Sequence, residues 1–217
     1  MPGWDLTKNK TYQILKAAED GAYGVLAPVA YNLEHIVAFI RAAELKRSPL
    51  IIQVFPWAVA FSSGLIVHAA AHAARNASVP VAVHLDHAQD ETLIRHAAVN
   101  LPFDSIMIDM SHHDMQENLK RTRHLVQICH DHGVATEAEP GRIEGGEDGI
   151  ANPDKFQASL TTEEEIDSFI ATGADFLAPC IGNVHGDYSA SGPNLDFDLQ
   201  DPEKVTRQND TGSTRDQ

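Results

Sequence analysis

Cysteine is scarce in this sequence, and long hydrophobic runs are absent from it. The two cysteines among 217 residues, Cys129 and Cys180, stand far apart and outside any paired motif. This predicts free thiols in a reducing compartment, not a disulfide framework. No apolar segment follows Met1 and no run of about 18 apolar residues occurs, so neither a signal peptide nor a membrane-spanning helix is expected. We therefore predict a cytoplasmic protein with no membrane partner.

Basic side chains are also few. The chain carries 16 Lys and Arg against 31 Asp and Glu, which gives a formal net charge of −15. This balance argues against a nucleic-acid partner and against anionic membrane surfaces, because both are bound through Lys and Arg. A small phosphorylated ligand is compatible with it, since a local set of N–H groups can hold one phosphate. The hydrophobic fraction of 43% is typical of a folded domain.

Predicted strands and helices alternate along the chain. Apolar, β-branched runs predict strands at residues 23–29, 49–55, 81–87, 105–111, 134–139 and 176–182. Helical spacing of apolar residues predicts helices at 9–20, 33–45, 65–77, 91–99, 115–132 and 162–172. Alternation with short connections is typical of a parallel sheet with helices outside it.

Polar side chains stand at the carboxyl ends of these strands. They are Asp86, His87, Asp109, Glu139 and His185. In a βα barrel such ends converge on one mouth, where α/β enzymes place their chemistry. His and carboxylate side chains that meet there are a donor set for a metal ion. From the residues alone, solvated polar groups at strand ends are the alternative.

Four motifs carry a family resemblance. In order, VAVHLDHAQD, SIMIDMSHHDMQEN, TEAEPGRIEGGEDG and PCIGNVHGDY resemble the class II, zinc-dependent fructose-bisphosphate aldolases, from about Tyr12 to about Leu199. The resemblance implies a (β/α)8 TIM barrel. It also implies reversible cleavage of fructose 1,6-bisphosphate, a small phosphorylated sugar of glycolysis and gluconeogenesis, to dihydroxyacetone phosphate and glyceraldehyde 3-phosphate. Relatives that act on tagatose-bisphosphate share these patterns, so that substrate is the alternative.

The resemblance also implies a metal site. His87 and His185 match two zinc histidines, and Asp109 and Glu139 match carboxylates near alternative metal positions. Aldol cleavage leaves negative charge on a carbonyl oxygen, which must be stabilised by a positive group. No lysine falls inside a predicted strand, where a Schiff base would be expected, so Zn²⁺ acting as a Lewis acid is the remaining option.

Further roles follow from the resemblance. Asp86 matches the carboxylate that transfers a proton at the substrate hydroxyl, and Glu147 matches an acid on a mobile glycine-rich loop. Gly186 matches a residue whose backbone lies near the substrate phosphate and a monovalent cation, Na⁺ or K⁺. The family further implies a homodimer or homotetramer.

The sequence departs from the family pattern in several places. A third zinc histidine, in a His-Gly-Gly-Ser-Gly type turn, and an Asn-x-Asp-Thr type phosphate turn are missing, and Val29 and Phe55 replace the family's frequent Asn and Ser. We expect an incomplete barrel of about six βα units over residues 1–199 and a disordered tail over 200–217. The expected consequence is weak zinc binding and little aldolase activity. An inactive fragment with an interaction role is a further alternative.

Overall fold

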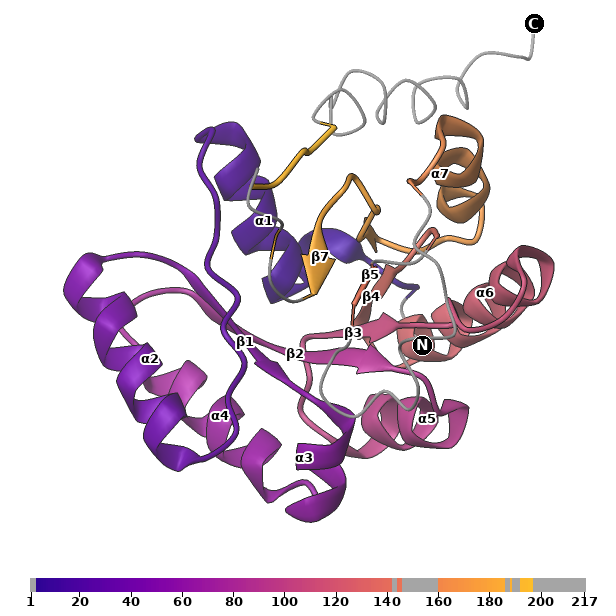
Figure 1. The fold of residues 1–217 in the computed structure, drawn as a ribbon. Helices are drawn as coiled ribbons and strands as arrows, with labels where there is room; N and C mark the ends of the chain where they lie inside the picture. Colours follow the sequence, from indigo (N-terminus) through magenta and orange to yellow (C-terminus); the bar gives the residue numbers. More distant parts are fainter. Residues whose placement is uncertain (1–2, 142–143, 146–159, 186–187, 189–191, 197–217) are drawn as a thin grey trace, which may run out of the picture.

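A parallel sheet forms the centre of the molecule (Figure 1). The computed structural model describes residues 3–141, 144–145, 160–185, 188 and 192–196, and the statements below concern these residues. Neighbouring strands of the sheet are all parallel and follow the order β1-β2-β3-β4-β6. Their bounds are β1 Leu50–Val54, β2 Val81–Ala88, β3 Ser105–Ile108, β4 Ala135–Ala138 and β6 Phe176–Leu177. A second, two-stranded sheet pairs β5 (Glu144–Gly145) with β7 (Val184–His185).

The helices match the predicted ones closely. Their bounds are α1 Lys10–Asp20, α2 Leu33–Lys46, α3 Pro56–Phe61, α4 Leu65–Asn76, α5 Glu91–Asn100, α6 Met115–Asp131 and α7 Glu163–Ile170, with a 3-10 turn at Leu6–Lys8. The sequence reading missed α3, which begins with Pro56 in the first turn, where its missing N–H costs nothing. A capping box joins Thr162 to Glu165 at the start of α7. Among the described helices, none is long and apolar enough to span a membrane.

The segment predicted as a first strand, 23–29, runs beside β1 without forming a continuous ladder. Leu26 and Val29 make isolated parallel bridges to Leu50 and Gln53. Pro28 accepts a hydrogen bond from the Gln53 N–H through its carbonyl oxygen, but it has no N–H to donate in return. The position of the strand was therefore predicted correctly, while its regular pairing was not.

The two faces of the sheet differ in chemistry. Val81, Val83 and Leu85 of β2 belong to the main core, which packs against the outer helices. On the opposite face, Ile14 of α1 packs against Ile51 and Ala82 in a smaller apolar cluster. Figure 1 shows α1 on the side of the sheet away from α2, α4 and α5. This inner face carries polar residues toward the carboxyl ends of the strands, because alternate residues of a strand point to opposite faces.

These features confirm the predicted parallel α/β fold, with the outer helices following their strands as in a βα barrel. The predicted glycine-rich loop with Glu147, the Gly186 position and the predicted tail at 200–217 lie outside the described residues.

Candidate metal centre

A bulge at the end of β2 places two site residues on one side of the sheet. Regular alternation would send Asp86 and His87 to opposite faces. The pairing of β2 with β3 shifts between Leu85 and Ala88, and His87 has a φ of 45°. As a result Ala88 joins Leu85 in the outer core, and Asp86 Oδ1 lies 3.9 Å from His87 Nε2. Positive φ at a residue with a β-carbon is strained, and such strain is concentrated at functional sites.

Two carboxylates from neighbouring strands meet the His87 imidazole. His87 Nδ1 lies 3.1 Å from Asp109 Oδ2, beyond the end of β3, and 3.5 Å from Glu139 Oε2, beyond the end of β4. One donor atom from each of the three residues lies within 4.8 Å of the others. Asp109 and Glu139 are buried and the His87 side chain nearly so. A buried pair of carboxylates around one imidazole carries excess negative charge, which favours a bound cation.

The Asp109 carboxylate is fixed by neighbours that the sequence reading did not single out. Its Oδ1 accepts hydrogen bonds from the Ser111 N–H at 3.0 Å and the Ser111 hydroxyl at 2.6 Å, and its Oδ2 accepts one from Gln89 Nε2 at 2.9 Å. Burial alone would raise the pKa of Asp109, but the contacts with His87, Ser111 and Gln89 lower it below the ordinary value. Asp109 is therefore ionised in the folded protein and available to a cation.

The second predicted zinc histidine, His185, also lies beside His87. The His185 ring, on β7, stands edge-on to the His87 ring, with centroids 5.6 Å apart and planes at 86°. His185 is held there by the pairing of β7 with β5, although it is almost a hundred positions from His87 in the sequence. The structure thus brings together Asp86, His87, Asp109, Glu139 and His185, whereas the predicted Glu147 and Gly186 lie outside the described residues.

A buried polar row lies beneath this group. His84 Nδ1 is 2.8 Å from Ser105 Oγ, which in turn is 2.9 Å from Thr11 Oγ1 of α1. On its other side, His84 Nε2 is 3.3 Å from Glu137 Oε2. Desolvation, with a smaller contribution from the charge of His87, lowers the pKa of His84 to about 3.

Glu137 has the opposite shift. Its desolvation, followed by the repulsion from Asp86, raises its pKa to about 7. Near neutral pH the row therefore joins a neutral imidazole to a carboxyl group that readily keeps its proton. Glu137 lies on β4, two positions before Glu139, and it was not among the candidate residues found in the sequence.

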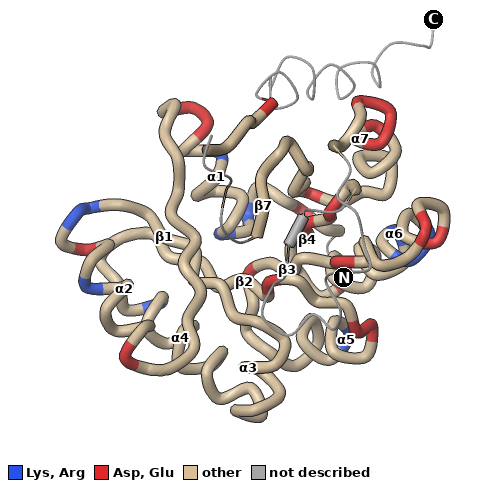
Figure 2. Tube along the Cα trace, in the orientation of Figure 1, with Lys and Arg blue, Asp and Glu red and all other residues tan. Residues whose placement is uncertain are grey.

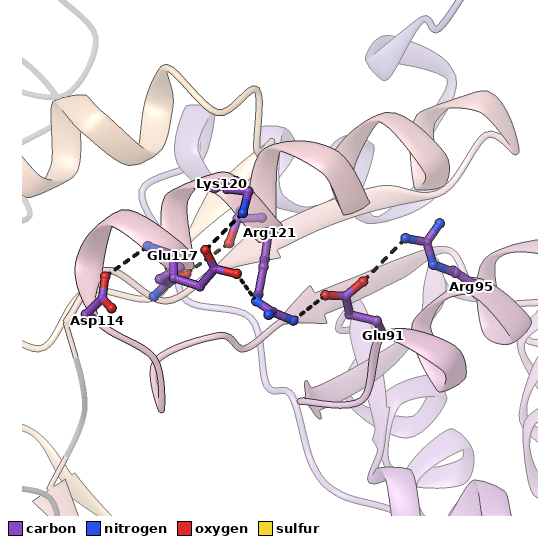
Figure 3. Close-up of polar contacts among 8 residues, drawn as sticks. Glu91, Arg95, Asp114, Glu117, Lys120 and Arg121 are labelled. Carbon is purple, nitrogen blue, oxygen red and sulfur yellow. Dashed lines mark hydrogen bonds and ion pairs between the residues drawn. The ribbon is translucent and has the colours of Figure 1, made fainter.

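The loops that carry the site are anchored by an ion-pair network between α5 and α6, drawn in Figure 3. Arg121 on α6 donates to Glu91 on α5 through Nη1 and to Glu117 through Nε, each at 2.7 Å. Arg95 and Lys120 add outer contacts to Glu91 and Glu117. Since α5 begins just after Gln89 and α6 begins shortly after Ser111, the network fixes the first turns of both helices relative to each other.

The donor set fits a zinc ion. Catalytic zinc is usually held by three protein ligands drawn from His nitrogen and carboxylate oxygen, with a further position left open. His87, Asp109 and Glu139 supply one nitrogen and two oxygens, and His185 stands next to them. Figure 2 shows acidic segments near the ends of β2 and β4, while Lys and Arg lie mainly on the outer helices. No buried cationic side chain among the described residues competes for the place of the ion.

A protein-family model matches most of the chain. The model described as fructose-bisphosphate aldolase class-II matches residues 9–205. A protein of Coccidioides immitis (strain RS), provisionally named a fructose-bisphosphate aldolase, is 50% identical over 91% of this chain and 68% of its own length. The fructose-bisphosphate aldolase of Streptococcus pneumoniae serotype 4 is 37% identical over 86% of this chain and 63% of its own length.

Solved structures agree with the sequence comparisons. The crystal structure of a Coccidioides immitis protein, also described provisionally as a fructose-1,6-bisphosphate aldolase, superposes with a TM-score of 0.87 at 50% identity. It covers 92% of this chain and 70% of the solved one. The chain thus spans about two thirds of the length of the relatives it matches.

Proposed function

The chain belongs to the class II fructose-bisphosphate aldolase family, and we propose that it catalyses the reversible, zinc-dependent cleavage of fructose 1,6-bisphosphate to dihydroxyacetone phosphate and glyceraldehyde 3-phosphate. The observation that carries the proposal is the meeting of Asp86 with the buried His87, Asp109 and Glu139 at the carboxyl ends of three neighbouring strands.

The metal in this proposal is Zn²⁺, held by His87 with His185, Glu139 or Asp109 as further ligands. These side chains are assigned by their donor chemistry and their proximity. When bound, the ion supplies positive charge that polarises the substrate carbonyl. Asp109 would keep the His87 imidazole in position through the contact at Nδ1, as carboxylates commonly do for metal-bound histidines.

Asp86 is proposed to move the proton at the substrate hydroxyl. In cleavage, the hydroxyl proton on C4 passes to the Asp86 carboxylate while the C3–C4 bond breaks. The bonding electrons move toward the ketose carbonyl, and C4 leaves as the aldehyde. Asp86 is buried beside His87, so its carboxylate is shielded from bulk water and held near the polarised carbonyl. Glu147 is proposed to return a proton to C3, a role supported by the GGEDG motif alone.

The resemblance supports the remaining assignments. We propose that Gly186 lies near a substrate phosphate and a monovalent cation, Na⁺ or K⁺. We further propose that residues 1–199 form the aldolase unit and that a tail follows, although the family model still matches its first residues, 200–205. We also propose a cytoplasmic protein that assembles as a homodimer or homotetramer. The substrate is a small phosphorylated sugar, and no nucleic acid or membrane partner is proposed.

The test is an assay of fructose 1,6-bisphosphate cleavage, coupled to reduction of the triose phosphate products. We expect slow cleavage, in line with the weak zinc binding expected from the sequence, that is abolished by a chelator, restored by Zn²⁺ and unaffected by borohydride with substrate. Asp86→Asn should lower kcat at least about a hundredfold, while the matched control Asp131→Asn, at the exposed end of α6, should leave it unchanged. Cleavage that survives chelation and is destroyed by borohydride would refute the metal mechanism, and no cleavage with Zn²⁺ present would refute the activity.

A further inference from the structure

Four donor atoms surround the Asp109 carboxylate. An ionised carboxylate has about four acceptor positions, shared between its two oxygens. Ser111 fills two positions at Oδ1, through its N–H at 3.0 Å and its hydroxyl at 2.6 Å. At Oδ2 the Gln89 side chain donates through Nε2 at 2.9 Å, and His87 Nδ1 lies 3.1 Å away. The Gln89 amide therefore fills one position of Oδ2, and the His87 imidazole lies at the other.

The Gln89 amide has one orientation that fits its neighbour. Gln89 directly follows β2 and is half-buried. A carboxylate only accepts hydrogen bonds, so the amide nitrogen, and not the amide oxygen, must face Asp109. Asp109 is 1% exposed, and a buried acceptor that loses its donor costs free energy because water does not replace the bond. The contact between Gln89 and Asp109 is therefore a stable feature of the folded protein.

The backbone on both sides of Gln89 is held in place. The carbonyl oxygen of Ala88, just before it, accepts a hydrogen bond from the Asp109 N–H at 3.0 Å. Asp90, just after it, is the N-cap of α5, and its side chain accepts a hydrogen bond from the Thr92 N–H at 2.7 Å. The Gln89 side chain thus reaches Oδ2 from a fixed starting point, which is what a supporting contact in a functional site requires.

We propose that Gln89 is a positioning residue of the metal centre, which holds Asp109 Oδ2 against His87 Nδ1 so that His87 binds zinc through Nε2. This rests on the proposed function. With the Gln89 amide in place, Asp109 keeps one position of Oδ2 for the His87 N–H and acts on the ion through His87. A hydrogen bond at one ring nitrogen of a histidine commonly fixes which nitrogen binds the metal. Without the Gln89 donor, Asp109 no longer holds the His87 ring in one orientation.

The first test measures zinc affinity by competition with a zinc indicator, with no substrate present. Gln89→Met keeps the length of the side chain without the donor and should weaken zinc binding by about threefold to tenfold, less than Asp109→Ala does, because Gln89 acts one contact further from the ion. In the Asp109→Ala background, Gln89→Met should change the affinity by less than about twofold, since its only route to the ion is then gone.

Gln127→Met is the matched control. It removes the same kind of bond, from Gln127 Nε2 to Asp131 Oδ1 at 2.8 Å, on the exposed side of α6. Its zinc affinity should equal that of the wild type. Zinc binding that follows this pattern in a protein that cleaves nothing would refute the aldolase function and retain the Gln89 assignment.

A second measurement needs no metal. Proton NMR of the metal-free, ¹⁵N-labelled protein should show a His87 Nδ1–H signal that is shifted downfield by the hydrogen bond to Asp109, and that is assigned by its absence in Asp109→Ala. In Gln89→Met this signal should broaden or disappear as the proton exchanges with water, whereas Gln127→Met should keep it. A general loss of stability would not remove this one signal from a protein whose circular dichroism matches wild type.

Three results would overturn the Gln89 assignment. One is a zinc affinity of Gln89→Met equal to that of the wild type. Another is a loss of affinity of the same size with and without Asp109, which would show that Gln89 does not act through that carboxylate. The third is an unchanged His87 Nδ1–H signal in Gln89→Met. If the wild type binds no zinc, the metal mechanism is refuted, and the NMR comparison then decides whether Gln89 positions His87.

Discussion

Ser105→Ala removes a single oxygen atom from the centre of the polar row, and we expect it to be strongly destabilising. Ser105 is fully buried, and its hydroxyl lies 2.8 Å from His84 Nδ1 and 2.9 Å from Thr11 Oγ1. Alanine leaves both groups without this partner in a place that water does not reach. A buried polar group that loses its hydrogen bond costs about 1–3 kcal/mol. Two such groups, one of which can rotate, give an expected loss of about 2–4 kcal/mol.

Urea unfolding followed by circular dichroism measures this loss as a change in midpoint at constant slope. Ser168→Ala is the matched control, because that hydroxyl is exposed and donates only to the Glu164 carbonyl within α7; its effect should stay within about 0.5 kcal/mol. His84→Leu combined with Ser105→Ala should cost less than the sum of the single changes, since both partners of the hydrogen bond are then apolar.

Two results would contradict this prediction: a loss below about 0.5 kcal/mol for Ser105→Ala, or free-energy changes of the two single variants that add up in the double variant. Either outcome would mean that the buried row contributes no more than ordinary packing, and that His84 does not depend on Ser105 for its hydrogen bond.

Three further predictions concern protonation, thiols and metal. In the metal-free Glu137→Gln variant, the free energy of unfolding should fall as the pH is lowered below about 6.5, by up to about 1.4 kcal/mol per pH unit. The cause is His84, which takes up a proton in the unfolded chain but not in the folded protein, where its pKa is about 3. In the wild type, Glu137 has a pKa of about 7 and stays protonated in the folded protein, which offsets the effect of His84 between about pH 4.5 and 6.5. If the free energy of unfolding varies as little with pH in the variant as in the wild type, the raised pKa of Glu137 is contradicted. Cys129 and Cys180 should resist iodoacetamide at pH 8 in the native protein and react in urea, because both are buried and desolvation raises the pKa of Cys129 to about 12. Mass spectrometry after quenching counts the modified thiols, and rapid labelling of the native protein would contradict the buried positions. Asp109→Asn should weaken Zn²⁺ binding at least about tenfold in calorimetry, and unchanged affinity would remove Asp109 from the metal centre.

Local sequence patterns were sufficient to predict the order of the elements and most of the candidate site. The order of strands and helices follows from local patterns of apolar residues, and the parallel sheet follows from their alternation. The candidate residues Asp86, His87, Asp109 and Glu139 were found because parallel strands end at one edge, so that polar residues at those ends must meet. Sequence motifs then identified the family, and the family-model match bears this out.

Sequence reasoning was weakest where a regular pattern breaks. Pro56 directly follows the predicted strand at 49–55, where no helix was expected, yet it begins α3. Pro28 prevents a regular ladder beside β1. The bulge at His87 reverses the alternation that the apolar run predicts, because a register shift depends on the partner strand and leaves no local signal.

The sequence by itself determined which residues stand at strand ends, because strand and helix periods are local properties of the chain. Only the tertiary structure decided which of those residues touch. It placed His185 beside His87 through the pairing of β5 with β7, joined His84 to Glu137, and set Gln89 against Asp109. The physical reason is that these contacts join segments that are far apart in the chain, and their distances are set by strand register and packing, which no window of neighbouring residues encodes.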